Sequence, residues 1–171
     1  EMCIRDSHIL SLVNDLLDFQ RLESGEMEVH SVPFRVPVLF DEIYTSFQPI
    51  AEAKGLRFVL NLKPEETGQV YMGDPIRIRQ VVGNLLSNAI KFTEAGRVVL
   101  LVSLQKLSAV HYQLSITVSD SGPGIPKEEQ ERIFGEFTRL ADTEEVEGFG
   151  LGLSITRKLL SLMNGTLALD S

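Results

Sequence analysis

Residues 74–96 form a long helical pattern that starts with Asp74 and a proline and ends with a glycine. At about 100° per residue, its apolar positions fall on one side. They are Val82, Leu85, Leu86, Ala89 and Ile90. The opposite side is polar and comprises Arg77, Gln80, Asn84, Asn88 and Lys91. The pattern predicts a helix that covers an apolar layer on one side and presents polar groups on the other.

Asn84 and Asn88 are unusual residues for the polar side of a helix. A solvated face is the ordinary explanation of a polar stripe, but such a face favours Glu, Lys or Ala. Each asparagine costs roughly half a kcal/mol of helix propensity relative to alanine. The spacing of i and i+4 places both amides on the same face. From this helix alone, a solvated face and a binding face are both open interpretations.

The composition limits the classes of protein to which the chain can belong. Its 171 residues, 43% of them hydrophobic, suffice for one domain with a sizeable core, or one domain plus an appendage. The net charge of −8 disfavours nucleic acid and anionic membrane surfaces as partners. No apolar run approaches the ~20 residues that span a bilayer, and no signal-peptide pattern is present. The single cysteine, Cys3, excludes an internal disulfide and fits a reducing compartment.

The first thirty residues fall into two parts. Residues 1–7, Glu-Met-Cys-Ile-Arg-Asp-Ser, resemble a translated sequencing adapter, so we expect them to be a non-native scar. Beyond them, apolar residues three, four and three positions apart form a broad stripe typical of a bundle helix, with Gly25 as its predicted stop. These residues are Ile9, Leu12, Leu16 and Phe19. A terminal helix that packs on its own domain is the alternative.

The remaining periodicities predict an α+β fold, a two-layer α/β sandwich preceded by one bundle helix. The expected strands are residues 31–34, 56–62, 97–104, 112–119 and the start of one at 166–169. The strands at 97–104 and 112–119 should pair as an antiparallel hairpin. The expected helices are residues 37–54, stopped by Gly55 and loosened by Pro49, a short segment at 127–134, and residues 151–164, ended by Gly165.

The turn that follows the strand at 112–119 begins with Asp120. The inward side chains of this strand should be Leu114, Ile116 and Val118. Because side chains alternate along a strand, Asp120 should point the same way. A carboxylate in an apolar layer needs a hydrogen-bond donor, and the exocyclic amine of adenine is one candidate. The alternative is that Asp120 only caps the turn made by Gly122, Pro123 and Gly124.

A glycine-rich segment, Gly148-Phe149-Gly150-Leu151-Gly152-Leu153, opens the last predicted helix. Glycines there would let a phosphate approach the exposed backbone N–H groups of the helix start. The segment is not a dinucleotide-binding fingerprint, because an acidic loop precedes it where a buried strand would be needed. It is not a P-loop either, since no Gly-Lys-Ser/Thr follows. We expect the acidic loop to be a solvated lid, with Arg139 as the cation that can swing inward.

The order and spacing of these segments resemble the catalytic and ATP-binding domain of sensor histidine kinases, which shares its fold with gyrase and Hsp90 ATPases. The N box of that family matches residues 84–92, the G1 box 120–125, the F box 133–137 and the G2 box 148–153. The resemblance implies a catalytic domain at residues 31–171, truncated at its C-terminus. Residues 8–30 resemble the last helix of the dimerisation and histidine phosphotransfer domain with its linker.

The resemblance implies ATP and Mg²⁺ as cofactors and assigns roles to individual residues. Asn88 and Asn84 would hold the Mg²⁺, while Lys91 and Arg139 would neutralise phosphate charge. Asn84, Lys91 and Arg139 would be the catalytic residues. Asp120 would accept a hydrogen bond from the adenine amino group. The remaining nucleotide contacts would be Phe92, Gly122, Gly124, Ile125, Gly148, Phe149, Gly150, Leu151, Gly152 and Leu153.

Three features depart from the family pattern. Ser121 stands where threonine is usual, and Phe149 is bulkier than the residue in many members. The phosphoacceptor motif, a histidine followed by an acidic residue and Arg-Thr/Asn-Pro, is absent from this sequence. His8, His30 and His111 lack those neighbours. The fragment is therefore not expected to phosphorylate itself.

The residue at position 84 indicates whether the γ-phosphoryl group of ATP is transferred to an acceptor side chain or released by hydrolysis. Gyrase- and MutL-like relatives place a glutamate there to activate water, whereas an amide cannot act as a general base. The resemblance therefore implies a protein histidine kinase of a two-component system. In the parent homodimer, the γ-phosphoryl group would pass to a histidine of the dimerisation domain and then to an aspartate of a response-regulator receiver domain. A non-catalytic nucleotide-binding module and an anti-sigma-factor type serine kinase are the alternatives.

The expected location is the bacterial cytoplasm, with the parent either a simple or hybrid kinase and either soluble or an inner-membrane receptor.

Overall fold

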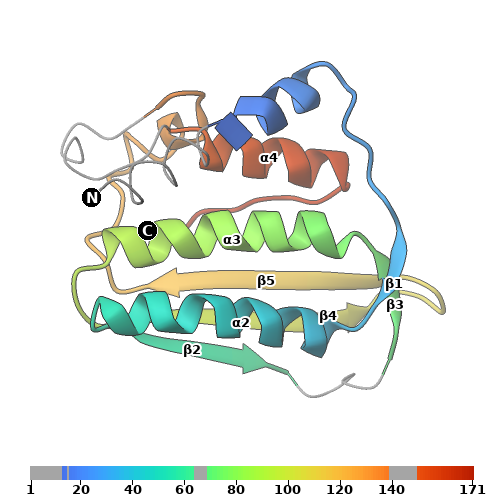
Figure 1. Cartoon of the computed structure of the whole chain (residues 1–171), viewed down its shortest axis with the longest axis horizontal. Helices are drawn as coiled ribbons and strands as arrows, with labels where there is room; N and C mark the ends of the chain where they lie inside the picture. Colours follow the sequence, from blue (N-terminus) through green and yellow to red (C-terminus); the bar gives the residue numbers. More distant parts are fainter. Residues whose placement is uncertain (1–12, 15, 64–68, 139–149) are drawn as a thin grey trace. The chain divides into compact units, whose positions relative to one another are not determined.

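The computed structural model describes residues 13–14, 16–63, 69–138 and 150–171 (Figure 1). The predicted scar at residues 1–7 and the first part of the predicted bundle helix lie outside these ranges. The chain divides into two compact units, one made of Glu1–Val29 and Ile125–Ser171 and the other of His30–Gly124.

The unit His30–Gly124 contains helices α2 (Val36–Ala53) and α3 (Pro75–Phe92) beside a three-stranded sheet (Figure 1). The strands of this sheet are β2 (Arg57–Leu62), β4 (Arg97–Lys106) and β5 (Tyr112–Asp120), in the order β2-β4-β5. The predicted hairpin is confirmed, because β4 and β5 pair antiparallel from Val98↔Asp120 to Lys106↔Tyr112. Strand β2 runs parallel to β4 on its other side. This arrangement confirms the predicted α+β class.

The core of this unit lies between the two helices and the sheet. Alternate residues of β4 point toward the helices, so Val98, Leu100 and Val102 are almost fully buried. They meet apolar side chains from one side of each helix, including Phe40 and Ile43 of α2 and Val82 and Leu86 of α3. The Phe58 ring of β2 stacks on Tyr44 of α2, with ring centroids 5.0 Å apart.

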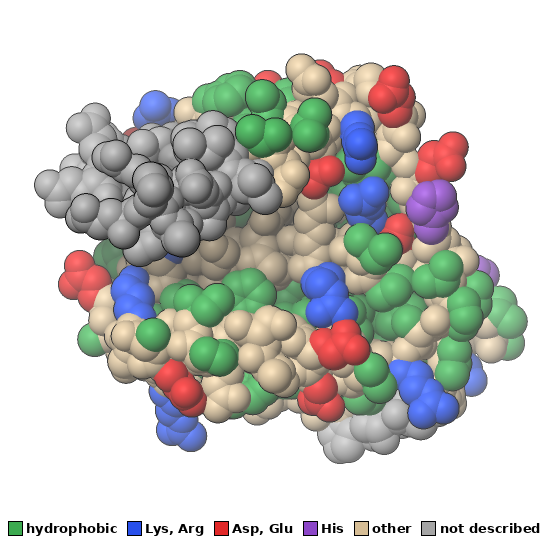
Figure 2. Space-filling model, in the orientation of Figure 1, with side chains coloured by type: hydrophobic (Ala, Val, Ile, Leu, Met, Phe, Trp, Pro, Cys, Tyr) green, Lys and Arg blue, Asp and Glu red, His purple; other side chains and the backbone are tan. Residues whose placement is uncertain are grey.

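A second, two-stranded sheet joins β1 (Val32–Phe34) to β3 (Tyr71–Gly73), with Pro33 opposite Met72. Strand β1 was predicted within residues 31–34, whereas β3 was not predicted. Apolar side chains gather on the surface at this end of the unit (Figure 2). Val32, Val70 and Met72 are 41%, 55% and 66% exposed.

The ends of α2 follow the predictions. Pro37 lies in the first turn, and Gly55 takes a left-handed backbone conformation (φ +74°) directly after the helix. Pro49 lies inside α2, which nevertheless continues to Ala53.

The other unit contains a helical segment at residues 16–23, a short 3₁₀ helix η2 (Arg132–Phe134) and helix α4 (Gly152–Leu162). The predicted helix at 127–134 is thus a turn followed by η2. At the end of α4, Asn164 rather than Gly165 takes the left-handed conformation (φ 56°), and the Gly165 amide donates to the Leu160 carbonyl at 2.7 Å. The predicted strand at 166–169 is wrong, since these residues are not paired with any described strand. None of the described helices is both long enough and apolar enough to cross a membrane.

Candidate functional site

The polar stripe of α3 is half-buried along its whole length. Each of the five predicted polar residues is intermediate in exposure, whereas Ile76 on another side of the helix is 71% exposed. The buried side comprises Val81, Val82, Leu86, Ala89 and Ile90. Val81 is thus buried although it was not predicted to be, and Leu85, which was, is only half-buried. The buried side is shifted because α3 packs against α2 as well as against the strands. The stripe is therefore not the fully solvated face of the ordinary explanation.

Asn84 and Asn88 lie one turn apart on this stripe, in the second half of α3. No described residue shares a hydrogen bond with the Asn88 side chain, so its amide is available to a ligand. Within the described ranges, no group of three or more His, Cys, Asp or Glu side chains is placed so that it could hold a metal ion. A magnesium ion here would rely on amide oxygens, phosphate oxygens and water, which are ligands it accepts.

The last turn of α3 carries Lys91 and Phe92. The Lys91 ammonium lies 4.8 Å from the centroid of the Phe92 ring, and both side chains are half-buried. The buried Thr93 caps the helix, because its hydroxyl donates to the Ala89 carbonyl at 2.7 Å. Lys54, at the end of α2, donates from Nζ to the carbonyls of Ile90 (2.7 Å) and Lys91 (2.6 Å). Sequence reasoning missed Lys54, since no local pattern indicates that it reaches α3.

Asp120 is exposed, which corrects the expectation that an apolar layer surrounds it, although it keeps the predicted alternation along β5, opposite the buried Val98. The reason is that β5 is an edge strand of the described sheet, so even its inward residues are only half-buried. Oδ1 of Asp120 accepts from the Gly122 amide at 2.8 Å, which is the turn-capping contact. No described residue donates to Oδ2, so this oxygen is available to a ligand.

The turn that follows β5 packs directly against the end of α3. A Cβ atom on Gly122 would lie 2.8 Å from Asp120 Oδ1, 3.2 Å from the Phe92 carbonyl oxygen and 3.4 Å from Thr93 Oγ1. Glycine is therefore needed for this close approach. The structure brings Asp120 and Gly122 to the helix end that carries Lys91 and Phe92.

Two further positions of this turn have structural roles. Gly124 has a φ of +76°, which favours glycine. The hydroxyl of Ser121 accepts from the Arg97 amide (2.9 Å) and lies 3.1 Å from the Ala95 carbonyl oxygen, to which it donates. The serine thus keeps the hydroxyl of the usual threonine.

The glycine-rich segment belongs to the other unit. Gly150 has a φ of +71°, and a Cβ atom there would lie 2.6 Å from the Thr138 carbonyl oxygen. Leu151 is buried, while Gly152 and Leu153 begin α4 and are half-buried. The half-buried Ile125 donates its amide to Ser171 Oγ at 2.6 Å. Arg139, Gly148 and Phe149 lie outside the described residues.

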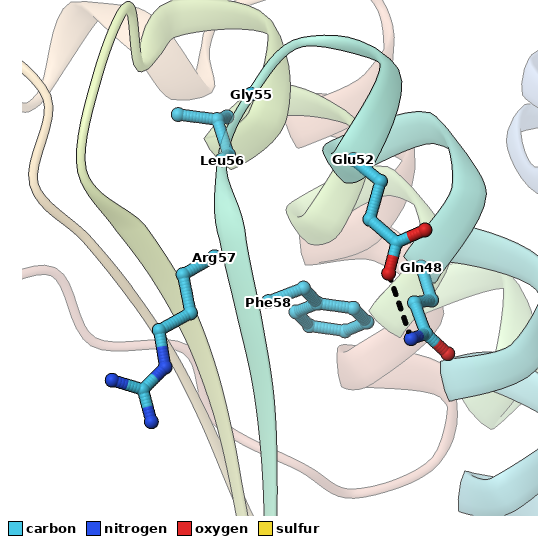
Figure 3. A pocket seen from close by; sticks show the side chains of 6 residues that line it. All are labelled: Gln48, Glu52, Gly55, Leu56, Arg57 and Phe58. Atoms are coloured by element: carbon cyan, nitrogen blue, oxygen red, sulfur yellow. Dashed lines mark hydrogen bonds between the residues drawn. The ribbon is translucent and has the colours of Figure 1, made fainter.

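Two pockets lie apart from these residues. One, of about 420 Å³, is lined by Gln48, Glu52, Gly55, Leu56, Arg57 and Phe58 (Figure 3). There Phe58 points toward α2 and Arg57 points away, as the predicted alternation requires. The other, of about 510 Å³, is lined by Phe134, Gly135, Glu136, Ser154, Arg157, Lys158 and Ser161. Neither contains a predicted nucleotide contact.

Comparison with known families places these residues in context. Residues 73–171 match the model of the family described as histidine kinase-, DNA gyrase B-, and HSP90-like ATPases. The chain belongs to this family. The match includes the whole of α3, the turn at Asp120 and the glycine-rich segment, so the predicted resemblance is confirmed.

Relatives of this ATPase family extend the likeness over nearly the whole chain. The chain is 39% identical to the signal transduction histidine-protein kinase BarA of Escherichia coli K12, over 96% of this chain and 18% of BarA. It is 34% identical to the autoinducer 2 sensor kinase/phosphatase LuxQ of Vibrio vulnificus CMCP6, over 99% of this chain and 20% of LuxQ. The chain therefore spans about a fifth of the length of these relatives.

Solved structures agree with this assignment. Full-length ShkA in complex with AMPPNP matches with a TM-score of 0.80 at 33% identity, over 95% of this chain and 33% of ShkA. The catalytic domain of the histidine kinase ThkA, in a nucleotide-free form, matches with a TM-score of 0.58 at 30% identity, over 79% of this chain and 82% of that domain. The comparisons support the histidine-kinase interpretation and not the alternatives.

A cluster around Lys158 of α4 was not predicted from the ATPase family pattern. The Lys158 ammonium pairs with Glu23, lies 2.9 Å from Glu136 Oε1 and sits 4.1 Å from the centroid of the Phe19 ring. Phe137, which is 62% exposed, lies 6.5 Å from Phe19 between ring centroids. Burial lowers the pKa of Lys158, but hydrogen bonds and charge from Glu23 and Glu136 outweigh it, so the pKa is raised overall.

Proposed function

We propose that this chain is the catalytic part of a two-component sensor histidine kinase. It binds Mg·ATP and transfers the γ-phosphoryl group to a histidine of the parent's dimerisation domain, for relay to a response-regulator aspartate. The observation that carries this proposal is the half-buried polar stripe of α3, with Asn84 and Asn88 one turn apart and the Asp120 turn packed against its end. The matched structure of ShkA with AMPPNP supports an adenine nucleotide as the ligand.

The residues of α3 would act by position and charge. When bound, Mg²⁺ neutralises charge on the phosphate oxygens during phosphoryl transfer. Asn88 and Asn84 supply the amide oxygens for this ion, and Lys91 adds positive charge at the same end of the helix. Arg139 is assigned to the phosphates only by family resemblance. Because Asn84 cannot accept a proton from water, transfer to a positioned nucleophile is favoured over hydrolysis.

Asp120 would select the base. Its Oδ2 can accept from the adenine amino group while Oδ1 keeps the Gly122 amide. Guanine presents a carbonyl oxygen at the equivalent place, which a carboxylate repels. The glycine-rich segment before α4, with Ile125, Leu151 and Leu153, is assigned to the same nucleotide by family resemblance.

The proposed parent is a bacterial homodimer. Residues 8–30 would be the end of its dimerisation domain with the linker, and residues 31–171 its catalytic domain. The partners would be the parent's own phosphotransfer domain and a receiver domain. The catalytic part would lie in the cytoplasm, whether or not the parent is anchored in the inner membrane.

Calorimetric titration with ATP, with and without Mg²⁺, tests the binding step. We expect Asn88→Ala to weaken Mg·ATP binding by about tenfold or more and to change metal-free ATP binding less. The matched control is Asn61→Ala, because Asn61 is an exposed asparagine on β2 of the same unit. Absence of Mg·ATP binding to the unmodified chain, or equal effects of the two variants, would contradict the proposal.

The transfer step needs an acceptor that this sequence lacks. We therefore propose mixing the chain with a separately produced dimerisation domain that carries the phosphoacceptor histidine, in the presence of γ-labelled Mg·ATP. Label that is stable to base and lost in acid indicates phosphohistidine. Binding without transfer would favour the non-catalytic nucleotide-binding module.

A further inference from the structure

Ser121, the residue after Asp120, ties the turn that follows β5 to the loop between α3 and β4. Its hydroxyl accepts from the Arg97 amide at 2.9 Å and donates to the Ala95 carbonyl at 3.1 Å. Its backbone amide donates to the Arg97 carbonyl at 3.1 Å. One residue of the turn is therefore bonded to both ends of the loop.

The loop is shaped to receive this hydroxyl. Gly96 lies in its middle with a φ of +108°, a conformation that favours glycine. A Cβ atom on Gly96 would collide with Ser121 Oγ, so only glycine leaves room for the hydroxyl. The Gly96 carbonyl also accepts from the Arg57 amide at 3.0 Å, at the start of β2. The loop that binds Ser121 is thus itself held by the sheet.

The hydroxyl also determines where the chain leaves the sheet. In a hydrogen-bonded antiparallel pair, the two residues exchange both backbone N–H···O bonds. Arg97 and Ser121 would be the next pair of β4 and β5, but the Ser121 hydroxyl accepts from the Arg97 amide in place of the Ser121 carbonyl. The backbone can therefore turn away after Ser121 toward α3, where Gly122 packs against the Phe92 carbonyl.

We propose that Ser121 is a positioning residue for base recognition, acting through Asp120. This inference rests on the proposed function, in which Asp120 Oδ2 accepts from the adenine amino group. Asp120 Oδ1 accepts from the Gly122 amide at 2.8 Å, so the direction of the carboxylate depends on where Gly122 lies. Ser121 fixes Gly122, because it anchors the residue between Asp120 and Gly122 to the α3–β4 loop. Asp120 is exposed, so side-chain packing does not hold its carboxylate instead.

Replacing Ser121 should weaken the choice of base more than the binding of phosphate. Inosine triphosphate (ITP) is the probe, because its base carries a carbonyl oxygen where adenine carries the amino group. In Ser121→Ala we expect the ratio of Mg·ATP to Mg·ITP affinity to fall about fivefold, because two side-chain hydrogen bonds are lost. The affinity for Mg·ITP should change less than about twofold. Ser121→Thr should retain the ratio, because it keeps a hydroxyl on the same carbon.

The test is calorimetric titration of the chain with both nucleotides, in a double-mutant cycle with Asp120→Asn. If Ser121 acts through Asp120, adding Ser121→Ala to Asp120→Asn should change Mg·ATP affinity less than about twofold further. The matched control is Ser119→Ala, which should keep the ratio, since Ser119 is an exposed serine of β5. If Ser121→Ala does not fold, Ser121→Cys replaces it, because a thiol is only a weak donor and acceptor.

The outcomes separate this inference from the proposed function. Equal losses of Mg·ATP and Mg·ITP affinity in Ser121→Ala would overturn it, because they indicate general damage to the site. So would a preference for ATP that survives in Ser121→Ala, or additive effects of the Ser121 and Asp120 substitutions. If the unmodified chain does not bind Mg·ATP, the proposed function itself fails and the inference fails with it.

Discussion

Asp74 ties the first turn of α3 to the backbone of His30, whose amide nitrogen lies 2.9 Å from Asp74 Oδ2. The other carboxylate oxygen, Oδ1, accepts from the amides of Ile76 (3.1 Å) and Arg77 (3.0 Å). The Asp74 residue is only 5% exposed. One carboxylate therefore caps the helix that carries the candidate site and also fixes the segment that leads into β1.

Replacing Asp74 should destabilise the unit His30–Gly124. We expect Asp74→Ala to lower the free energy of unfolding by about 2–4 kcal/mol, because the helix cap and the His30 contact are lost together. Asp74→Asn should cost about 1 kcal/mol, since it keeps one acceptor oxygen for the cap. Urea unfolding measures both values, with the exposed Asp41→Ala as the control. Equal losses in the Ala and Asn variants would show that the helix cap contributes nothing beyond the His30 contact.

Asp120→Asn separates base recognition from turn capping. The asparagine keeps an acceptor for the Gly122 amide, so the turn should remain. Its amino group can no longer accept from adenine but can donate to the guanine carbonyl. We expect ATP affinity to fall about tenfold or more and the preference for ATP over GTP to shrink. Competition binding with the two nucleotides measures this. Unchanged ATP affinity in Asp120→Asn would leave only the turn-capping role.

Asn84→Glu tests why transfer is favoured over hydrolysis. The substitution places a carboxylate one helical turn before Asn88, where water-activating relatives carry a glutamate. We expect the rate of phosphate release at saturating Mg·ATP to rise about a hundredfold over the unmodified chain, because a general base becomes available. Asn61→Glu is the control for added charge. A rate that stays at the level of the unmodified chain would mean that the amide at position 84 is not what prevents hydrolysis.

The Lys158 cluster should give a pH-dependent contribution to stability. The pKa of Lys158 is raised in the folded state, so its contribution is fully present below the unfolded value of about 10.4 and is lost as pH rises through the folded value. We expect Lys158→Met to lower the free energy of unfolding by about 1–2 kcal/mol at pH 7. This difference from the unmodified chain should shrink above about pH 10.5. Urea unfolding at pH 7, 9 and 11 measures it, and a difference that grows with pH would contradict the assignment.

Local patterns predicted much of this fold. The helical period of α3 predicted its apolar and polar faces, and the two-residue alternation along β4 and β5 predicted the hairpin. Each of these signals lies within a few neighbouring residues. Contacts between distant residues were not predictable in this way. The residues next to Lys54 in the sequence do not indicate that its ammonium binds the carbonyls of Ile90 and Lys91. Those next to His30 do not indicate that its amide donates to Asp74.

The errors have physical reasons too. Residues 166–169 were predicted to begin a strand, but a strand needs a partner and none of the described strands pairs with them. Asp120 obeys the predicted alternation, yet its exposure depends on how far the layer extends over β5, which is a property of the whole sheet. For the candidate site, the sequence indicated Asn84, Asn88, Lys91 and the Asp120 turn, while the contacts that hold them together came only from the structure.

The parallel pairing of β2 with β4 has a consequence for how the chain acquires its site. Arg57 pairs with Arg97, and the chain between them contains β3 and the whole of α3. Closing this long loop is slow relative to forming a helix or a hairpin, because much chain entropy is lost before the non-local contacts form. Helix α2 packs against β2, while α3 packs against both α2 and β5, so the helix layer over the sheet is complete only when β2 and β4 have met. During refolding, recovery of nucleotide binding should therefore follow the slow assembly of the sheet and not the fast appearance of helix.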